Sequence, residues 1–67
     1  MTKHDKDLNI SRIRTARDQL WTTQKVLEEF TRQLSDPGLN MTANTEKNAV
    51  DGIRSFLKDV ETFLHGQ

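Results

Sequence analysis

Hydrophobic positions recur at intervals of three and four residues in both halves of the chain. The first series comprises Ile13, Ala16, Leu20, Thr23, Leu27, Phe30 and Leu34, and the second comprises Val50, Ile53, Leu57, Val60 and Leu64. Only Thr23 interrupts the apolar character of these series. This spacing gathers side chains on one face of an α-helix, whereas a half-buried strand would alternate apolar and polar residues. The pattern therefore predicts two amphipathic helices.

The segment LSDPGLNMT, residues 34–42, separates the two helical patterns. A residue that precedes proline is disfavoured in the helical conformation, so we expect Asp36 to end the first helix. Pro37-Gly38 suits the central pair of a type II turn. The side chain of Asn40 or Thr42 can accept a backbone N–H and begin the second helix. The segment is thus predicted to reverse the direction of the chain.

These boundaries predict one helix over about 9–35, an Asp-Pro-Gly turn over 36–41 and a second helix over about 43–65. Gly66 follows as a suitable helix stop. The predicted fold is all-α: an antiparallel two-helix hairpin that forms one domain over residues 1–67.

A chain of 67 residues buries only a modest share of its surface, so a hairpin of this size is marginal alone. Because the chain has no cysteine, disulfides cannot reinforce it, and association with another chain is the remaining means. Two copies can cover each other's apolar stripes as a four-helix bundle. A different protein that covers the same surface is the alternative. The expected core of either assembly comprises Phe30, Phe56, Leu57, Val60, Phe63 and Leu64.

Composition argues against several classes of function. The formal net charge is zero, which gives no overall attraction to nucleic acid or to an anionic membrane. No stretch is apolar enough for a transmembrane helix or a secretion signal, and the lack of cysteine fits a reducing compartment, so we expect a cytoplasmic protein.

Chemistry-bearing residues are sparse. The only histidines, His4 and His65, lie near the chain ends, and no serine has a histidine close to it in sequence. The three glycines are isolated and form no phosphate-binding loop. We therefore expect no enzyme, no metal, no cofactor and no small-molecule substrate.

The stretch RIRTARDQLW, residues 12–21, is the most distinctive local feature. Arg14 and Arg17 share a helical face that continues to Trp21, the only tryptophan, and Arg17 and Trp21 are spaced to form a cation–π pair. Arginine and tryptophan are enriched at protein-binding hot spots, so Arg14, Arg17 and Trp21 form our candidate partner-binding site. One alternative is structural: Trp21 packs over the N-terminal tail or widens the dimer core, and the arginine stems cover its ring. The other is a patch that binds phosphate.

Residues 1–14, MTKHDKDLNISRIR, resemble the start of the Rop family of plasmid copy-number proteins. The resemblance implies a helical hairpin that dimerises and binds paired RNA loops through its first helix, and Lys3 and Asn9 match RNA-contacting positions. It needs a one-residue gap and fades after Arg14. Ile13 replaces the important phenylalanine of that family, Arg17 replaces a glutamine, and the Asp-Pro-Gly turn is foreign to it.

Two functions follow as expectations. The first is a small interaction protein, an adaptor, co-chaperone or inhibitor of phage or plasmid origin, that presents a helical face to a protein partner. Its size and shape are also similar to those of the helical-hairpin co-chaperones of type III secretion needles. The alternative is a Rop-like dimeric RNA-binding regulator, whose RNA-binding residues would be Lys3, Asn9, Arg12, Arg14 and Arg17.

Overall fold

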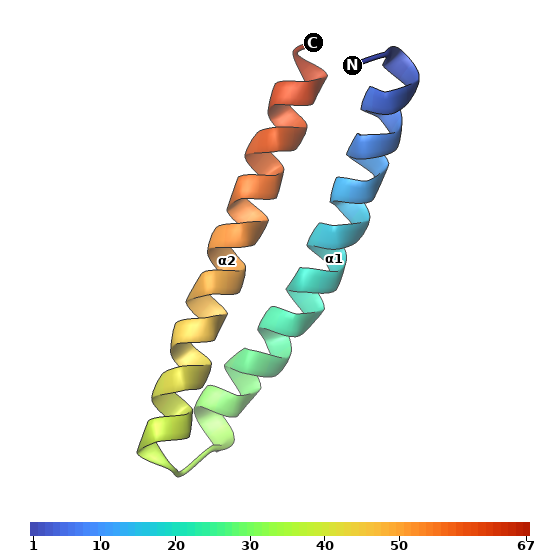
Figure 1. Ribbon diagram of the computed structural model, residues 1–67. Helices are drawn as coiled ribbons and strands as arrows, with labels where there is room; N and C mark the ends of the chain where they lie inside the picture. The colour runs from blue at the N-terminus through green and yellow to red at the C-terminus, as the bar shows by residue number, and fades with distance from the viewer.

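The computed structural model describes all residues from 1 to 67 and contains two helices, α1 (Lys3–Gln33) and α2 (Pro37–His65). The helices run antiparallel and lie side by side, and both chain ends meet at one tip of the molecule (Figure 1). The molecule measures 50 × 14 × 12 Å, so it is a rod only two helices wide. The predicted all-α hairpin is confirmed.

α1 begins about six residues earlier than the predicted start near residue 9. The hydroxyl of Thr2 accepts a hydrogen bond from the backbone N–H of Asp5 at 3.1 Å and caps the helix. The acidic side chain of Asp5 also lies in the first turn, where its negative charge interacts favourably with the positive end of the helix dipole. The N-terminal residues are therefore helical, and the prediction of a helix start near residue 9 was wrong.

α2 also begins earlier than predicted, at Pro37 instead of near residue 43. Asp36 is its N-cap and accepts from the backbone N–H of Leu39 at 2.8 Å. No residue has a positive φ, which excludes the predicted type II turn at Pro37-Gly38. Proline suits the first position of a helix because its missing N–H would have no partner there. The Asp-Pro-Gly sequence thus starts a helix, and Leu34–Asp36 alone connect the two helices.

Asn40 does not cap α2, contrary to the sequence-based expectation. Its side-chain amide donates to the backbone carbonyl oxygens of Thr31 and Leu34. These carbonyls lie at the end of α1, where no helical N–H remains to bond them. Asn40 therefore ties the start of α2 to the end of α1. Gly66 ends α2 as predicted, in a right-handed conformation with φ −80° and ψ −6°.

The helices meet along a seam that differs from the predicted stripe at alternate positions. Its non-exposed residues at three- and four-residue spacing are Ile10, Ile13, Arg17, Leu20, Gln24, Leu27 and Thr31 on α1, Leu34 in the connection, and Asn40, Ala43, Lys47, Val50, Arg54, Leu57, Glu61 and Leu64 on α2. Every second residue from Arg17 to Glu61 in this set is polar. We call this set the hairpin seam. It contains Leu20, Leu57 and Leu64 as predicted, but it excludes Phe30 and Ile53.

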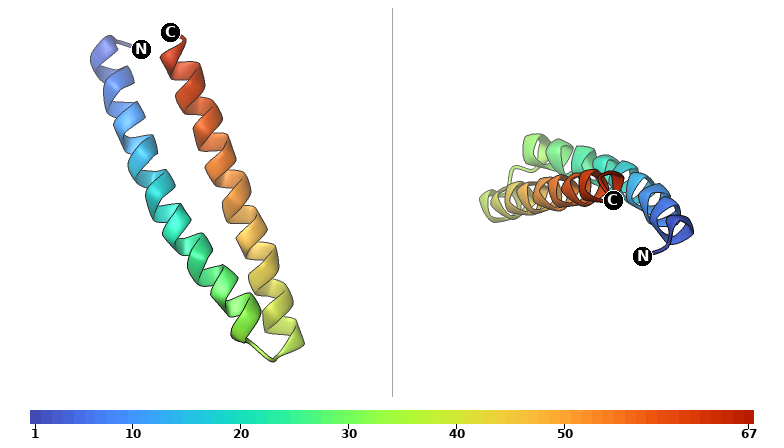
Figure 2. Two further views of the ribbon diagram at one scale, coloured as in Figure 1. Left: turned by 180° about the vertical axis from the view of Figure 1, so that it is seen from behind. Right: turned by 90° about the horizontal axis from the view of Figure 1, so that it is seen from above.

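Burial within the hairpin is slight. Only Ile10, Ile13, Ala43 and Leu64 are buried, and Ile10, Ile13 and Leu64 form one cluster near the tip that carries the chain ends. The two helices cross at a shallow angle, with no third element covering either side of the pair (Figure 2). The single hairpin therefore leaves most of its apolar side chains in contact with solvent.

Candidate interaction surfaces

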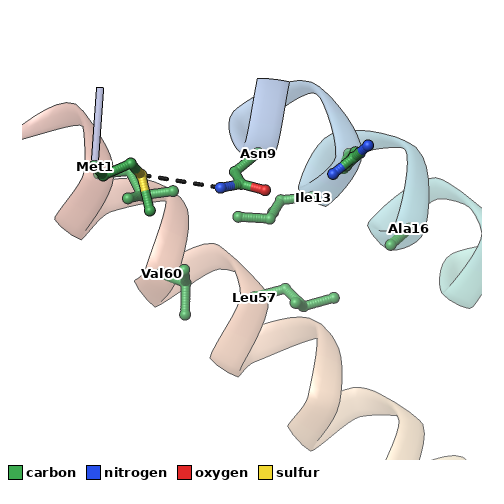
Figure 3. A pocket seen from close by; sticks show the side chains of 8 residues that line it. Met1, Asn9, Ile13, Ala16, Leu57 and Val60 are labelled. Atoms are coloured by element: carbon green, nitrogen blue, oxygen red, sulfur yellow. Dashed lines mark hydrogen bonds between the residues drawn. The ribbon is translucent and has the colours of Figure 1, made fainter. Parts of the chain in front are cut away.

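One side of the hairpin carries an apolar groove of about 370 Å³ between the helices. The residues that line it are Met1, Asn9, Arg12, Ile13, Ala16, Leu57, Val60 and Leu64. In Figure 3, Ile13 and Ala16 lie on one helix and Leu57 and Val60 on the other, around a common space. The amide of Asn9 donates to the sulfur of Met1 at 3.9 Å at the end of this groove. We call it the apolar groove.

Large aromatic side chains extend this apolar surface outward. Phe56 and Phe63 are 63% and 65% exposed, and Phe30 on α1 is 43% exposed. Phe56 lies three residues after Ile53 and four before Val60, so these side chains are neighbours on α2. We call the surface formed by Ala16, Phe30, Ile53, Phe56, Val60 and Phe63 the apolar face. Phe56 and Phe63 keep most of their surface exposed, whereas Phe30 is more than half covered.

The six residues predicted as an assembly core therefore divide into two groups. Leu64 is buried, and Leu57 and Val60 pack against the same internal cluster, so these three hold the hairpin itself together. The three phenylalanines point outward instead and are free to contact another molecule. Leu57 and Leu64 lie in the hairpin seam, Val60 packs beside it, and the three phenylalanines lie outside it.

A second groove, of about 150 Å³, is lined only by polar or charged residues, which are Arg17, Asp51, Arg54, Ser55 and Lys58. We call it the cationic groove. It shares no residue with the apolar groove. Arg17 and Arg54 belong to the polar half of the hairpin seam, and Arg54 donates from Nη1 to Oε1 of Gln24 at 2.9 Å. Sequence reasoning missed Arg54 and Lys58, since only the register of the two helices brings them next to Arg17.

The three residues of the predicted protein-binding patch have different surroundings. Arg14 is exposed and donates from Nε to Glu61 of α2 at 3.1 Å, so its charge is already paired. Arg17 is half-buried in the cationic groove. Trp21 is 49% exposed, and its ring is covered by Nζ of Lys25 at 5.1 Å from the ring centre. The cation beside the indole is therefore Lys25, not Arg17 as expected.

The residues expected for RNA binding lie along different sides of α1. Asn9 and Arg12 line the apolar groove, whereas Arg17 lines the cationic groove. Arg14 is paired with Glu61, and Lys3 is exposed in the first turn. One hairpin does not bring these five residues into a single surface.

Only the ion pair between Glu29 and Arg32 clearly shifts the pKa values of its members. Nη2 of Arg32 donates to both carboxylate oxygens of Glu29, at 2.9 and 2.8 Å. This hydrogen-bonded contact and the positive charge of Arg32 lower the pKa of Glu29, and the same contact raises the pKa of Arg32. Both side chains are exposed, so the pair is a surface feature of the last turns of α1.

The structure contains no group of three or more His, Asp or Glu side chains placed to hold a metal ion. Neither helix combines the length and the apolar character that crossing a bilayer requires. No protein-family model, no curated protein and no solved structure matches the chain. The resemblance of residues 1–14 to the Rop family therefore stands on those residues alone.

Proposed function

We propose that this protein is a non-enzymatic interaction module that works as a homodimer, with the apolar face as its dimer surface. Two hairpins would join through these faces into a four-helix bundle. The observation that carries the proposal is the exposure of Phe56 and Phe63 beside an apolar groove that no part of the chain fills. Large exposed apolar side chains next to an apolar groove are typical of interaction sites.

A second copy suits the apolar face better than an unrelated segment. The face includes residues of both helices, from Ala16 and Phe30 on α1 to Phe63 near the end of α2, so its occupant must also be long and helical. Another hairpin offers the same length and the same stripe. The net charge is zero, so two copies experience no overall repulsion.

The gain in stability from association is large relative to what one hairpin possesses. Complete burial of a phenylalanine side chain contributes roughly 1.5–3 kcal/mol. Inside the hairpin, only four residues are buried. Association would therefore supply most of the hydrophobic core, and folding and dimerisation would be coupled.

The dimer would then act through its outer surface, as an adaptor, co-chaperone or inhibitor that binds a protein partner. Trp21 supports this part of the proposal, since it is a half-exposed aromatic flanked by Lys25 and lies away from the apolar face. Large aromatic anchors of this kind carry much of the energy of protein interfaces.

The decisive experiment is light scattering over a dilution series, with helicity followed by circular dichroism. The native chain should have twice its 7.8 kDa mass and should lose helicity as it dissociates. The double variant Phe56→Ser and Phe63→Ser should be a monomer. Trp21→Ser is the matched control, because it removes an exposed aromatic side chain outside the apolar face and should leave the dimer intact. A native chain that is monomeric and fully helical at all concentrations would refute the dimer.

A further inference from the structure

The cationic groove gathers three positive side chains and one carboxylate between the two helices. Arg17 comes from α1, and Arg54, Lys58 and Asp51 come from α2. None of these four groups takes part in an ion pair, although Arg14 nearby is paired with Glu61. The formal charges of the lining residues therefore sum to +2, and none of these residues forms an ion pair.

The two arginines also have hydrogen-bonding capacity that the chain does not use. The Nε atoms of Arg17 and Arg54 are shielded from solvent and have no hydrogen-bond partner. Arg54 uses Nη1 for Gln24, whereas Arg17 makes no hydrogen bond to the rest of the chain. Buried donors without acceptors are costly, and arginine is suited to oxyanions that accept several N–H bonds at once. The groove therefore favours a ligand with several acceptor oxygens.

We propose that the cationic groove binds a phosphate dianion, either free inorganic phosphate or the phosphoryl group of a monoester. A dianion matches the net charge of +2, whereas a carboxylate or a phosphodiester would neutralise only half of it. Arg17 and Arg54 would hold the oxygens from the two helices, and Lys58, a mobile point charge, would offset the negative charge of Asp51. This site shares no residue with the apolar face, so it stands independently of the proposed dimer.

The test is an NMR titration of the full chain at pH 7.5 with inorganic phosphate, at ionic strength held constant with sodium chloride. We expect saturable shifts at the backbone N–H of Arg54 and Lys58 and at the Nε–H of Arg17 and Arg54. Arg17→Gln should weaken binding by about tenfold, since it removes a charged hydrogen-bond donor. Lys58→Gln should also weaken it, and this exposed residue can change without disturbing the hairpin.

Arg12→Gln is the matched control, because it removes the same charge from the apolar groove and should leave phosphate binding unchanged. Phenyl phosphate distinguishes the source: if it binds like inorganic phosphate, the groove accepts a monoester, and if only inorganic phosphate binds, it takes the free ion. Shifts that do not saturate, or equal weakening by Arg12→Gln, would overturn the site. Equal binding of dimethyl phosphate or acetate would overturn the assignment to a dianion.

Discussion

Asp36 stands between the two helices and decides where α2 begins. Its carboxylate accepts from the N–H of Leu39, which would otherwise have no partner at the helix start. We expect Asp36→Ala to lower the free energy of unfolding by about 1 kcal/mol, the usual cost of losing an N-cap. Urea unfolding measures this difference. Ser35→Ala is the control, because Ser35 is exposed and forms no side-chain hydrogen bond; an equal loss there would remove the capping argument.

The stabilisation that Glu29 provides through its pair with Arg32 depends on pH. Arg32 lowers its pKa in the folded chain, so the stabilisation from this pair is complete above the ordinary pKa of a glutamate. It is then lost as the pH falls through the lowered value. An NMR titration of the Glu29 carboxyl should therefore have a midpoint below the ordinary one.

Arg32→Gln should return the Glu29 midpoint to its ordinary value, because both causes of the shift come from Arg32. Arg12→Gln removes the same charge from a distant turn of α1 and should leave the midpoint in place. A lowered midpoint that persists without Arg32 would show that another group sets the pKa of Glu29.

Residue-scale features differed in how far the sequence could predict them. The capping role of Thr2 could be predicted from the sequence, since a threonine three residues before an acidic residue such as Asp5 is a recognised signal of a helix N-terminus. The partner of Trp21 was not, because Arg17 and Lys25 are both four residues from it and only the hairpin contact decides between them. Arg17 turns toward α2, which leaves Lys25 beside the ring.

At the scale of helices, the periodic pattern correctly predicted two long helices and their antiparallel arrangement. It could not predict which edge of the apolar stripe faces the neighbouring helix. On α2, Leu57 lies on one edge of the apolar stripe and Phe56 lies on the other. Burial of either edge against α1 is compatible with the three- and four-residue spacing. The hydrogen bond of Arg54 with Gln24 and the contacts of Asn40 accompany the observed choice.

Gly52 offers a test within α2. It is exposed in mid-helix, and a Cβ at this position would meet no atom within 4 Å. We expect Gly52→Ala to stabilise the chain by about 0.5–1 kcal/mol, because alanine loses less conformational entropy on helix formation. The measurement is the midpoint of thermal unfolding together with the mass in solution. A fall in stability or in dimer mass would indicate that another backbone approaches Gly52 closely.

At the scale of the whole molecule, the slight burial connects stability to the proposed dimer. If folding and dimerisation are coupled, Tm should rise with protein concentration. The rise should disappear in the variant with Phe56→Ser and Phe63→Ser and persist in Trp21→Ser. A Tm that stays constant over a hundredfold range of concentration would show that the hairpin is stable by itself.

The hairpin architecture followed from the sequence, but the two grooves did not. A groove between helices depends on register, and register was uncertain because the connection was predicted over residues 36–41 and is in fact Leu34–Asp36. Shifting the start of α2 to Pro37 adds more than one turn to that helix. The neighbours of Arg17 across the pair could be identified only once this was known.

Because both chain ends lie at one tip of a rod 50 Å long, a tandem fusion can measure the orientation of the two hairpins in the proposed dimer (Figure 1). If the two hairpins pack side by side with their chain ends at the same end of the bundle, a linker of a few residues suffices to join them. If the chain ends of the two hairpins lie at opposite ends of the bundle, the linker must span the whole rod. At about 3.3 Å per extended residue, this needs about 15 residues. The shortest linker that makes Tm independent of dilution would report the geometry of the bundle without any further structure.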